Sequence, residues 1–397
     1  MPAASTSTPG TRIRRTTVTA VLALLAVFAL LIPGVAEAKP GHGHHGDHRK
    51  SDHVTVMTRN LFLGADLGPA LASTTPEQFF QANGAILRQV TRTNFPVRAR
   101  GLADEILRAH ADLVGLQEVA LWRDAKPASL DPVLNGPSAT HVRYDFLALL
   151  LAQLNRHHPG LYRAVEVEPE FDFEAPADEN GVPNDGPGGL LANTEINGRL
   201  TMRDVILARK GVTTFNPQGG HFAHLLNVTV SGIPIAVTRG WTTVDAVVGR
   251  SRPFHFVNTH LEAFDPETVH PSIRAQQAGE LVAPGGPARS SLPVILVGDL
   301  NSDVATEVKP GDAQAYQVML DAGFVERSTS NPLSCCIESP TLQTGTVAEF
   351  DHQVDHVMTS SPTLVQLQKA VVTGRKMQNG FWDSDHAGIV SRLKVFR

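Results

Sequence analysis

Polar side chains lie at the ends of several short apolar runs in this sequence, where a buried strand would give way to a turn. They are Asn60, Glu118, His260, Asp299, Asn301, Asp355, Asp385 and His386. Each one alone has an ordinary explanation, as a surface acid, a hydrogen-bonded core histidine or the start of a turn. The ends of strands are nevertheless where α/β proteins build sites, because a rigid sheet positions side chains that loops can surround. Their coincidence indicates a functional site.

Some of these residues could hold a metal ion. Glu118 offers a hard oxygen ligand of the kind that Mg²⁺ prefers. Asp385, Asn60 or Asp299 could supply further oxygens. Since Mg²⁺ is held in proteins by one or two carboxylates together with substrate phosphate oxygens, this set points to phosphate chemistry.

The remaining residues could activate water. Asp299 and Asn301 lie two positions apart, so in an extended backbone their side chains project to the same side. The aspartate could then position a water while the asparagine amide donates to a phosphoryl oxygen. An aspartate beside a histidine orients the imidazole and stabilises its protonated form, which leaves the ring poised as a general base near neutral pH.

Short β-rich runs that alternate with helical patterns must position these residues. The predicted strands are 54–58, 112–117, 204–209, 225–230, 242–248, 254–259, 294–297, 353–359 and 387–395. The predicted helices are 99–110, 146–155 and 272–281. This alternation predicts an α/β fold with more than one sheet. The stretch 166–197 is rich in acids, Gly and Pro, which predicts a long surface loop.

Five segments carry a resemblance to a known family. They are Gly115–Val119, Asn258–Glu262, Gly298–Ser302, Asp355–Val357 and Ser384–His386, all following Asn60. Together and in this order they resemble the serial motifs of the endonuclease/exonuclease/phosphatase superfamily, and in particular its secreted bacterial DNase-like and sphingomyelinase-like members. The resemblance spans about 54–395.

The resemblance implies a fold and a cofactor. The fold is a four-layered α/β sandwich of two packed mixed β-sheets flanked by helices, so residues 53–397 would form one catalytic domain. Glu118 resembles the principal Mg²⁺ ligand of the family, with Asn60 and Asp385 close to the metal or the substrate. Mn²⁺ or Ca²⁺ could take the place of Mg²⁺.

The resemblance also implies catalytic roles. His386 resembles the base that activates water, oriented by Asp355. Asp299 and Asn301 resemble the residues that align the nucleophile and the phosphate. His260 resembles the histidine that stabilises the pentacovalent transition state or protonates the leaving oxygen.

In DNase-like members an acidic side chain orients this last histidine, and Asp204 is the candidate here. The expected reaction is in-line attack of water on phosphorus, without a covalent enzyme intermediate.

The substrate is less constrained. We expect a phosphodiester, with nucleic acid favoured over a sphingomyelinase or phospholipase C-like substrate and over inositol phosphates. A binding module without catalysis is the alternative of another class. Arg88, Arg92, Arg98 and Arg100 could contact phosphates, but we favour their being the solvated face of a helix. No stable protein partner is evident, so a monomer is expected.

The N-terminal residues predict export. Residues 1–38 combine Arg12, Arg14 and Arg15 with a short apolar run and a small-residue cleavage pattern, which is typical of a secretory signal peptide. Residues 39–52 form a His-rich linker. Removing residues 1–38 takes away three Arg and one Glu, so the formal charge of −5 becomes −7, which disfavours retention on nucleic acid or anionic lipid by bulk attraction.

Two adjacent cysteines, Cys335 and Cys336, are the only ones in the sequence. They are too few for a disulfide framework in a chain of 397 residues. A vicinal disulfide, an intermolecular bridge and two free thiols all remain open.

Overall fold

The computed structural model describes residues 51–264, 269–304, 313–330 and 332–397. The chain divides into two units, Met1–His48 and Arg49–Arg397, and the second contains every element described below. The predicted signal peptide lies outside the described residues. So does the predicted linker, except for Ser51 and Asp52, which begin the first strand.

The first β-sheet is 8-stranded, in the order β15-β16-β1-β2-β6-β3-β4, with β5 also paired to β6. Its strands are β1 (Ser51–Asn60), β2 (Leu113–Gln117), β3 (Leu121–Ala125), β4 (His141–Asp145), β5 (Tyr162–Ala177), β6 (Ile196–Arg209), β15 (Val365–Thr373) and β16 (Gly388–Phe396). The sheet is mixed, because β1 and β2 run parallel whereas β2 and β6 run antiparallel.

The second β-sheet is 6-stranded, in the order β13-β14-β12-β11-β10-β7. Its strands are β7 (Thr213–His221), β10 (Gly240–Val247), β11 (Phe254–His260), β12 (Val294–Asp299), β13 (Val325–Glu326) and β14 (Asp355–Thr359). Here β11 and β12 run parallel and β12 and β14 antiparallel. A separate hairpin consists of β8 (Leu226–Val230) and β9 (Ile233–Val237).

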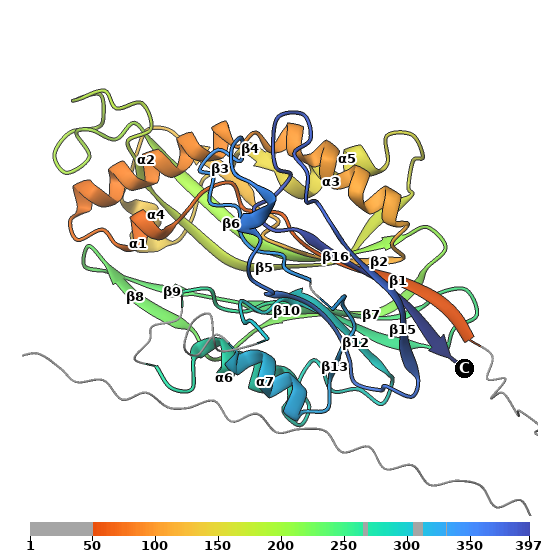
Figure 1. Ribbon diagram of the computed structural model, residues 1–397. Helices are drawn as coiled ribbons and strands as arrows, with labels where there is room; N and C mark the ends of the chain where they lie inside the picture. The colour runs from red at the N-terminus through yellow and green to blue at the C-terminus, as the bar shows by residue number, and fades with distance from the viewer. Residues whose placement is uncertain (1–50, 265–268, 305–312, 331) are drawn as a thin grey trace, which may run out of the picture. The chain divides into compact units, whose positions relative to one another are not determined.

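Helices cover the outer faces of both sheets, as Figure 1 shows. The first sheet carries α1 (Gly68–Leu71), α2 (Pro76–Arg92), α3 (Phe95–Ala109), α4 (Asp131–Asn135) and α5 (Phe146–Leu154). The second carries α6 (Ile273–Val282) and α7 (Gln314–Asp321), and a 3-10 turn, η1 (Val347–Glu349), lies later in the chain. The predicted four-layered α/β sandwich of two packed mixed sheets is confirmed.

Apolar side chains fill the space between the two sheets. Val54 of β1, Ile206 of β6, Val244 of β10 and Phe256 of β11 are fully buried in one cluster. All five residues of β2 are buried, because both faces of this central strand are covered. A strand buried on both faces requires the nearly continuous apolar run that β2 has.

Local signals fix where the helices begin. Thr75 precedes α2, and its side chain accepts a hydrogen bond from the backbone N–H of Gln78. Ser272 caps α6 in the same way, accepting from the N–H of Ala275. The predicted helix 272–281 is therefore within one residue of α6 at each end, with Ser272 as its cap.

The predicted surface loop 166–197 is wrong over its first third. Residues 162–177 form β5, which pairs with β6 from Tyr162 opposite Arg209 to Ala177 opposite Ile196. Acids of this stretch have defined partners: Asp172 pairs with Arg199 of β6, and Glu174 accepts from the backbone N–H groups of Ser138 and Ala139, just before β4.

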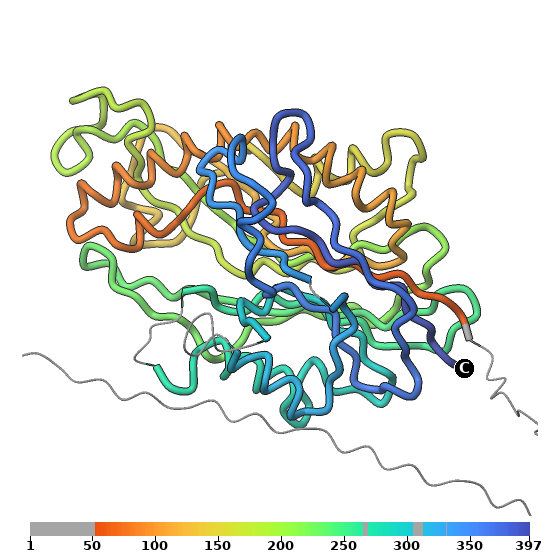
Figure 2. The backbone as a smooth tube through the Cα atoms, in the orientation of Figure 1, coloured from red at the N-terminus to blue at the C-terminus, as the bar shows by residue number. Residues whose placement is uncertain are grey.

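The two ends of the described unit lie side by side. Figure 2 follows the chain from β1, in red, to β16, in blue, and these strands pair antiparallel from Ser51 opposite Phe396 to Thr58 opposite Ile389. Among the described residues, none of the helices has the length and apolar character needed to cross a bilayer.

The inter-sheet cluster should dominate stability. Val244→Ala removes two methyl groups from a fully buried position, so we expect it to lower the free energy of unfolding by about 2 kcal/mol. Val371→Ala on β15, where the side chain is 41% exposed, is the matched control and should change it by less than about 0.5 kcal/mol. Urea denaturation followed by circular dichroism measures both, and equal losses would contradict the packing described.

Candidate active site

The predicted site residues meet at the edge of the sandwich where the parallel strands end. Asn60 ends β1 and His260 ends β11, while Glu118 directly follows β2. Asp299 ends β12 and lies opposite Asp355, the first residue of β14, in the antiparallel register. The remaining three, Asn301, Asp385 and His386, lie in the segments just after β12 and just before β16.

A chain of polar contacts joins both sheets at this edge. Asn60 donates from Nδ2 to Oδ2 of Asp299 across 3.0 Å. The same oxygen lies 3.7 Å from Nδ1 of His386 and 3.7 Å from Nε2 of His260. Nδ1 of His386 lies 2.9 Å from Oδ2 of Asp355. The histidine matched to the catalytic base is thus held by two buried carboxylates.

These carboxylates control the charge of the imidazole. Burial alone would lower the pKa of His386, but Asp355 and then Asp299 outweigh burial, so the pKa lies well above its ordinary value. Burial raises the pKa of Asp299, although His386 opposes the shift. The protonated imidazole is therefore strongly stabilised, as a base that must receive a proton requires.

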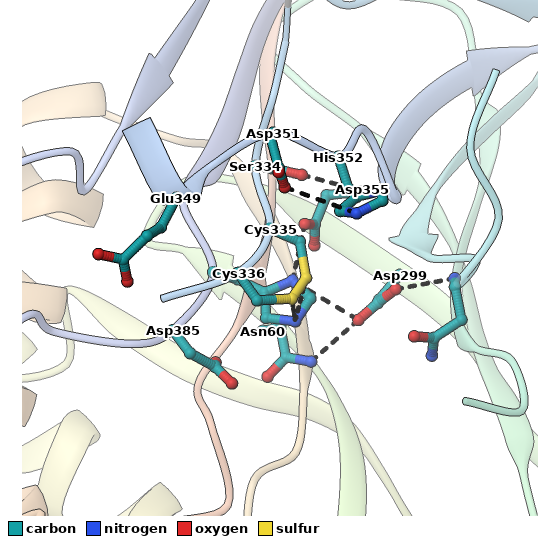
Figure 3. The surroundings of a disulfide bond; sticks show 12 residues. Asn60, Asp299, Ser334, Cys335, Cys336, Glu349, Asp351, His352, Asp355 and Asp385 are labelled. Atoms are coloured by element: carbon teal, nitrogen blue, oxygen red, sulfur yellow. Dashed lines mark hydrogen bonds and ion pairs between the residues drawn. A yellow bond between two sulfur atoms is a disulfide. The ribbon is translucent and has the colours of Figure 1, made fainter. Parts of the chain in front are cut away.

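A vicinal disulfide joins Cys335 and Cys336 beside this histidine. Their sulfur atoms lie 3.6 Å and 3.8 Å from Nε2 of His386, and Figure 3 shows the pair between Asp385, Asn60 and Asp355. Of the three thiol states that the sequence left open, the structure contains this one.

Glu118 and Asp385 line a cleft of about 450 Å³ next to these contacts. Oε2 of Glu118 accepts from the backbone N–H of Leu63 at 2.7 Å, and Oδ1 of Asp385 accepts from the Ser384 hydroxyl at 3.2 Å. Burial, and then the neighbouring Asp385, raise the pKa of Glu118. Burial also raises the pKa of Asp385.

The donor set of the cleft suits a hard divalent cation. Glu118 and Asp385 present carboxylate oxygens to one space, whereas the amide oxygen of Asn60, at the end of the neighbouring strand, accepts a hydrogen bond from the backbone N–H of Phe62. Two carboxylates whose ionisation is disfavoured by burial gain from a nearby cation, which would neutralise them. Glu118 and Asp385 therefore suit such a cation, and the part of Asn60 in the predicted ligand set stays a prediction.

His260 has a different partner from the one expected. Arg239 donates from Nη1 to Nδ1 of His260 across 3.1 Å. Asp204 lies near the same ring, with Glu170, within a buried group whose polar atoms are all within 4.8 Å of one another, but no hydrogen bond joins Asp204 to His260. Burial, and then Glu170, raise the pKa of Asp204 well above its ordinary value, which disfavours the charged form that such a partner would need.

The contact from Arg239 sets the tautomer of His260. Burial, and then the charge of Arg239, lower the pKa of His260 well below its ordinary value, so the ring is neutral. An arginine can only donate, so Nδ1 is the acceptor and the ring proton is on Nε2. His260 can therefore donate a hydrogen bond from Nε2, on the side that faces Asp299.

Asn301 does not lie on extended backbone. The strand β12 ends at Asp299, and Asn301 has a positive φ of 47°, so the expectation of two side chains on one strand face is wrong. Instead, the backbone N–H of Asn301 donates to Oδ1 of Asp299, and its side-chain Nδ2 donates to the carbonyl of Leu261. The turn brings Asn301 close to Asp299 by a different route.

The family model described as the Endonuclease/Exonuclease/phosphatase family matches residues 82–386. The chain belongs to this family. Its members are hydrolases that act on phosphoester bonds and generally use divalent metals, and the chain has their phosphoesterase fold. The match contains every predicted site residue except Asn60.

Several solved structures are similar in fold at low sequence identity. An endonuclease/exonuclease/phosphatase from Beutenbergia cavernae is 16% identical over 87% of this chain and 72% of its own, with a TM-score of 0.49. TDP2 from D. rerio, complexed with single-strand DNA product, is 16% identical over 86% and 98%, with a TM-score of 0.45. A mannosyl-6-phosphatase from Bacteroides thetaiotaomicron is 16% identical over 86% and 99%, with a TM-score of 0.43. None of the curated proteins compared matches the sequence.

Two features of this family site were missed from sequence. Arg239 lines the cleft and contacts His260, but its position before β10 carries no motif. Gln117 donates from Nε2 to Oδ1 of Asn258 across 2.6 Å, which links β2 to β11 between the sheets. A polar side chain inside each of two apolar strands was the signal that could have revealed this link.

The four arginines considered as phosphate contacts differ in their surroundings. Arg98 is fully buried and donates to the backbone carbonyls of Leu61, Phe62, Thr93 and Asp383, so the expectation of a solvated face is wrong for it. Burial lowers the pKa of Arg98 to about 9. Arg92 and Arg100 are exposed, as expected.

The Gln117–Asn258 link should show as an energetic coupling. Gln117→Ala or Asn258→Ala alone leaves a buried polar group without its partner, which costs about 1–3 kcal/mol. The double variant removes both groups. Its loss of unfolding free energy should therefore be smaller than the sum of the two single losses by about 1 kcal/mol or more. Urea denaturation of the four proteins gives the coupling.

The control cycle combines Asn258→Ala with Gln366→Ala, an exposed position on β15. Those losses should add within about 0.5 kcal/mol. Additive losses in the first cycle would show that the hydrogen bond does not couple the sheets.

Proposed function

We propose that this protein is a metal-dependent phosphodiesterase that hydrolyses its substrate by in-line attack of a water activated by His386. One observation carries the proposal: His386, which Asp355 and Asp299 hold, directly follows Asp385, and Asp385 lines a cleft together with Glu118. A base and a hard-oxygen ligand set at one cleft are what this reaction requires.

In the proposed proton transfer, His386 accepts the proton, and Asp355 and Asp299 stabilise the charge that forms. Nδ1 of His386 faces Asp355, so Nε2, which lies 3.6 Å and 3.8 Å from the sulfur atoms of Cys335 and Cys336, is the atom that remains to take the proton of the attacking water. Asp355 and Asp299 stabilise the imidazolium that forms. Asp299 is itself held in place by Asn60 and by the backbone N–H of Asn301.

His260 acts as a hydrogen-bond donor rather than as an acid. Its neutral ring carries the proton on Nε2, so it can donate to a phosphoryl or leaving oxygen as charge develops there. Arg239 fixes this tautomer and adds a positive charge to the same wall of the cleft.

A divalent cation, proposed as Mg²⁺ with Mn²⁺ or Ca²⁺ as alternatives, would be held by Glu118, Asp385 and Asn60. When bound, such an ion supplies Lewis-acid stabilisation of charge on the phosphoryl oxygens.

Nucleic acid, which the sequence favoured as substrate, stays a prediction. Among the described residues, the charged side chains that line the cleft are Asp66, Glu118, Glu338, Asp385 and Arg239. This balance gives a polyanionic strand little electrostatic support, since phosphates along a strand are bound chiefly by Lys and Arg. The proposal therefore rests on the reaction and not on a nuclease substrate.

The purified protein should hydrolyse bis(p-nitrophenyl) phosphate with Mg²⁺ or Mn²⁺ and stop with EDTA. His386→Gln should lower kcat by about 10²–10⁴-fold, because it removes the general base. His141→Gln, at a histidine whose side chain is 76% exposed on β4, is the matched control and should leave kcat unchanged. Full activity of His386→Gln would overturn the assignment of the base.

The pH dependence follows from the raised pKa of His386. Only the unprotonated ring can accept a proton, so the rate should rise with pH, with the acidic limb displaced above the ordinary range of a histidine. Asp355→Asn removes the largest raising influence, so it should move this limb to lower pH and reduce kcat by about 10²-fold.

The pH–rate profiles of the wild type and Asp355→Asn measure the shift. Asp351→Asn, at a side chain 68% exposed beside His352, is the control and should leave the limb in place. An acidic limb that is unchanged or that moves to higher pH in Asp355→Asn would contradict the role given to Asp355.

A further inference from the structure

The catalytic cleft has a charged end and an apolar end. Glu118, Asp385 and Arg239 line the first. Leu67 and Leu71 from the α1 segment and Phe171 from β5 line the second. Phe264, 41% exposed, adds an aromatic ring to the lining. A substrate whose phosphate reaches the charged end would have its remaining part against apolar side chains.

A second cavity begins where the apolar end stops. Leu67, Leu71 and Phe171 line both spaces, so the two adjoin at these side chains. All three are partly exposed rather than locked in the core. The second cavity has a volume of about 80 Å³, and roughly 10–15 Å³ suffices for one water.

The lining of this second cavity is almost entirely apolar. It includes Phe79, Leu87, Trp122, Phe173, Leu200 and Ile235. Among the described residues of this lining, the polar side-chain groups are the amide of Asn83 and the indole N–H of Trp122, and they donate to the carbonyls of Pro176 and Leu63. A water there would lack the two to four polar partners it needs, whereas apolar cavities of this kind stay dry and accept apolar molecules.

We propose that the second cavity binds the hydrocarbon chain of the substrate, which is a phosphate ester bearing one alkyl or acyl chain. This inference rests on the proposed function and names its substrate class. The chain passes Leu67, Leu71 and Phe171 and ends against Trp122, while the phosphate lies near Glu118 and Arg239. The acid-rich cleft suits such an ester, because it carries one phosphate rather than many.

A homologous series of methyl, butyl and octyl p-nitrophenyl phosphates, each below its micellar concentration, tests this assignment. Water attacks phosphorus, its proton passes to His386, and the P–O bond to the nitrophenyl group breaks with the electron pair leaving as p-nitrophenolate. The alkyl phosphate is the second product. Each buried methylene should raise kcat/KM about fourfold, so burial of about three of the seven added methylenes would make the octyl ester exceed the methyl ester by about 60-fold.

A filled cavity should remove the preference. Ala70 lines the second cavity and is 6% exposed, so Ala70→Leu places a side chain where the hydrocarbon would lie. The octyl-to-methyl ratio of kcat/KM should fall to within about threefold of one. Ala72→Leu makes the same change at an exposed position two residues away and should keep the ratio of the wild type. Thermal unfolding of both variants shows that each is folded.

Binding can be read without turnover. In EDTA, 8-bromooctyl phosphate should quench the fluorescence of Trp122, since a bromine atom quenches an indole only in contact. The other tryptophans, Trp241 and Trp382, pack in different clusters. Trp122→Phe should therefore abolish the quenching.

The outcomes separate the inference from the function on which it rests. Equal kcat/KM for the three esters, a higher kcat/KM for plasmid DNA, or the absence of quenching would overturn the chain-binding assignment and leave the phosphodiesterase intact. No hydrolysis of any ester with metal would overturn the proposed function and, with it, the substrate class.

Discussion

The approach of the two sheets at the ends of β2 and β11 is the constraint on which the site depends. The site residues come from both sheets, so their spacing follows from how closely the sheets pack there. Gly115 permits that approach, because a Cβ at this position would lie 2.4 Å from Val297 and 2.5 Å from Oδ1 of Asn258. The side chain of Asn258 accepts a hydrogen bond from Gln117 and donates one to the carbonyl of Leu116. Polar groups within an apolar interface thus fix the position of β2 relative to β11.

Close packing has an electrostatic consequence. The carboxyl groups of Glu118, Asp299 and Asp385 lie where burial raises their pKa values, which makes their ionised forms costly in the absence of a compensating charge. His386 supplies one such charge, and its own raised pKa shows that the attraction is mutual. Perturbed carboxyl groups gathered in a cleft are the usual mark of a functional site, since a folded chain gains no stability from them.

The sequence predicted the parts of this arrangement that depend on local pattern. Strand ends and short motifs located Asn60, Glu118 and His386, because each follows or precedes an apolar run whose period is readable. Composition misled where tertiary pairing decides: the acids of 166–177 indicated a loop, yet Asp172 meets Arg199 across the sheet. The partner of His260 could not be predicted for the same reason. The contact with Arg239 is tertiary, and nothing in the residues around Arg239 shows which strand it will face.

An irregularity in β5 connects the catalytic end of the cleft to its apolar end. Pro169 pairs with Arg203 and Phe171 with Met202, so Glu170 is an extra residue in the ladder. Its buried carboxylate accepts from the backbone N–H of Gly240, next to Arg239, and burial raises the pKa of Glu170 to about 7. Without that extra residue the alternation of the strand would give the inward position to a different side chain, and Phe171 would no longer lie where both cavities meet. The orientation of Arg239 and the wall of the apolar cavity thus depend on the same local departure from regular pairing.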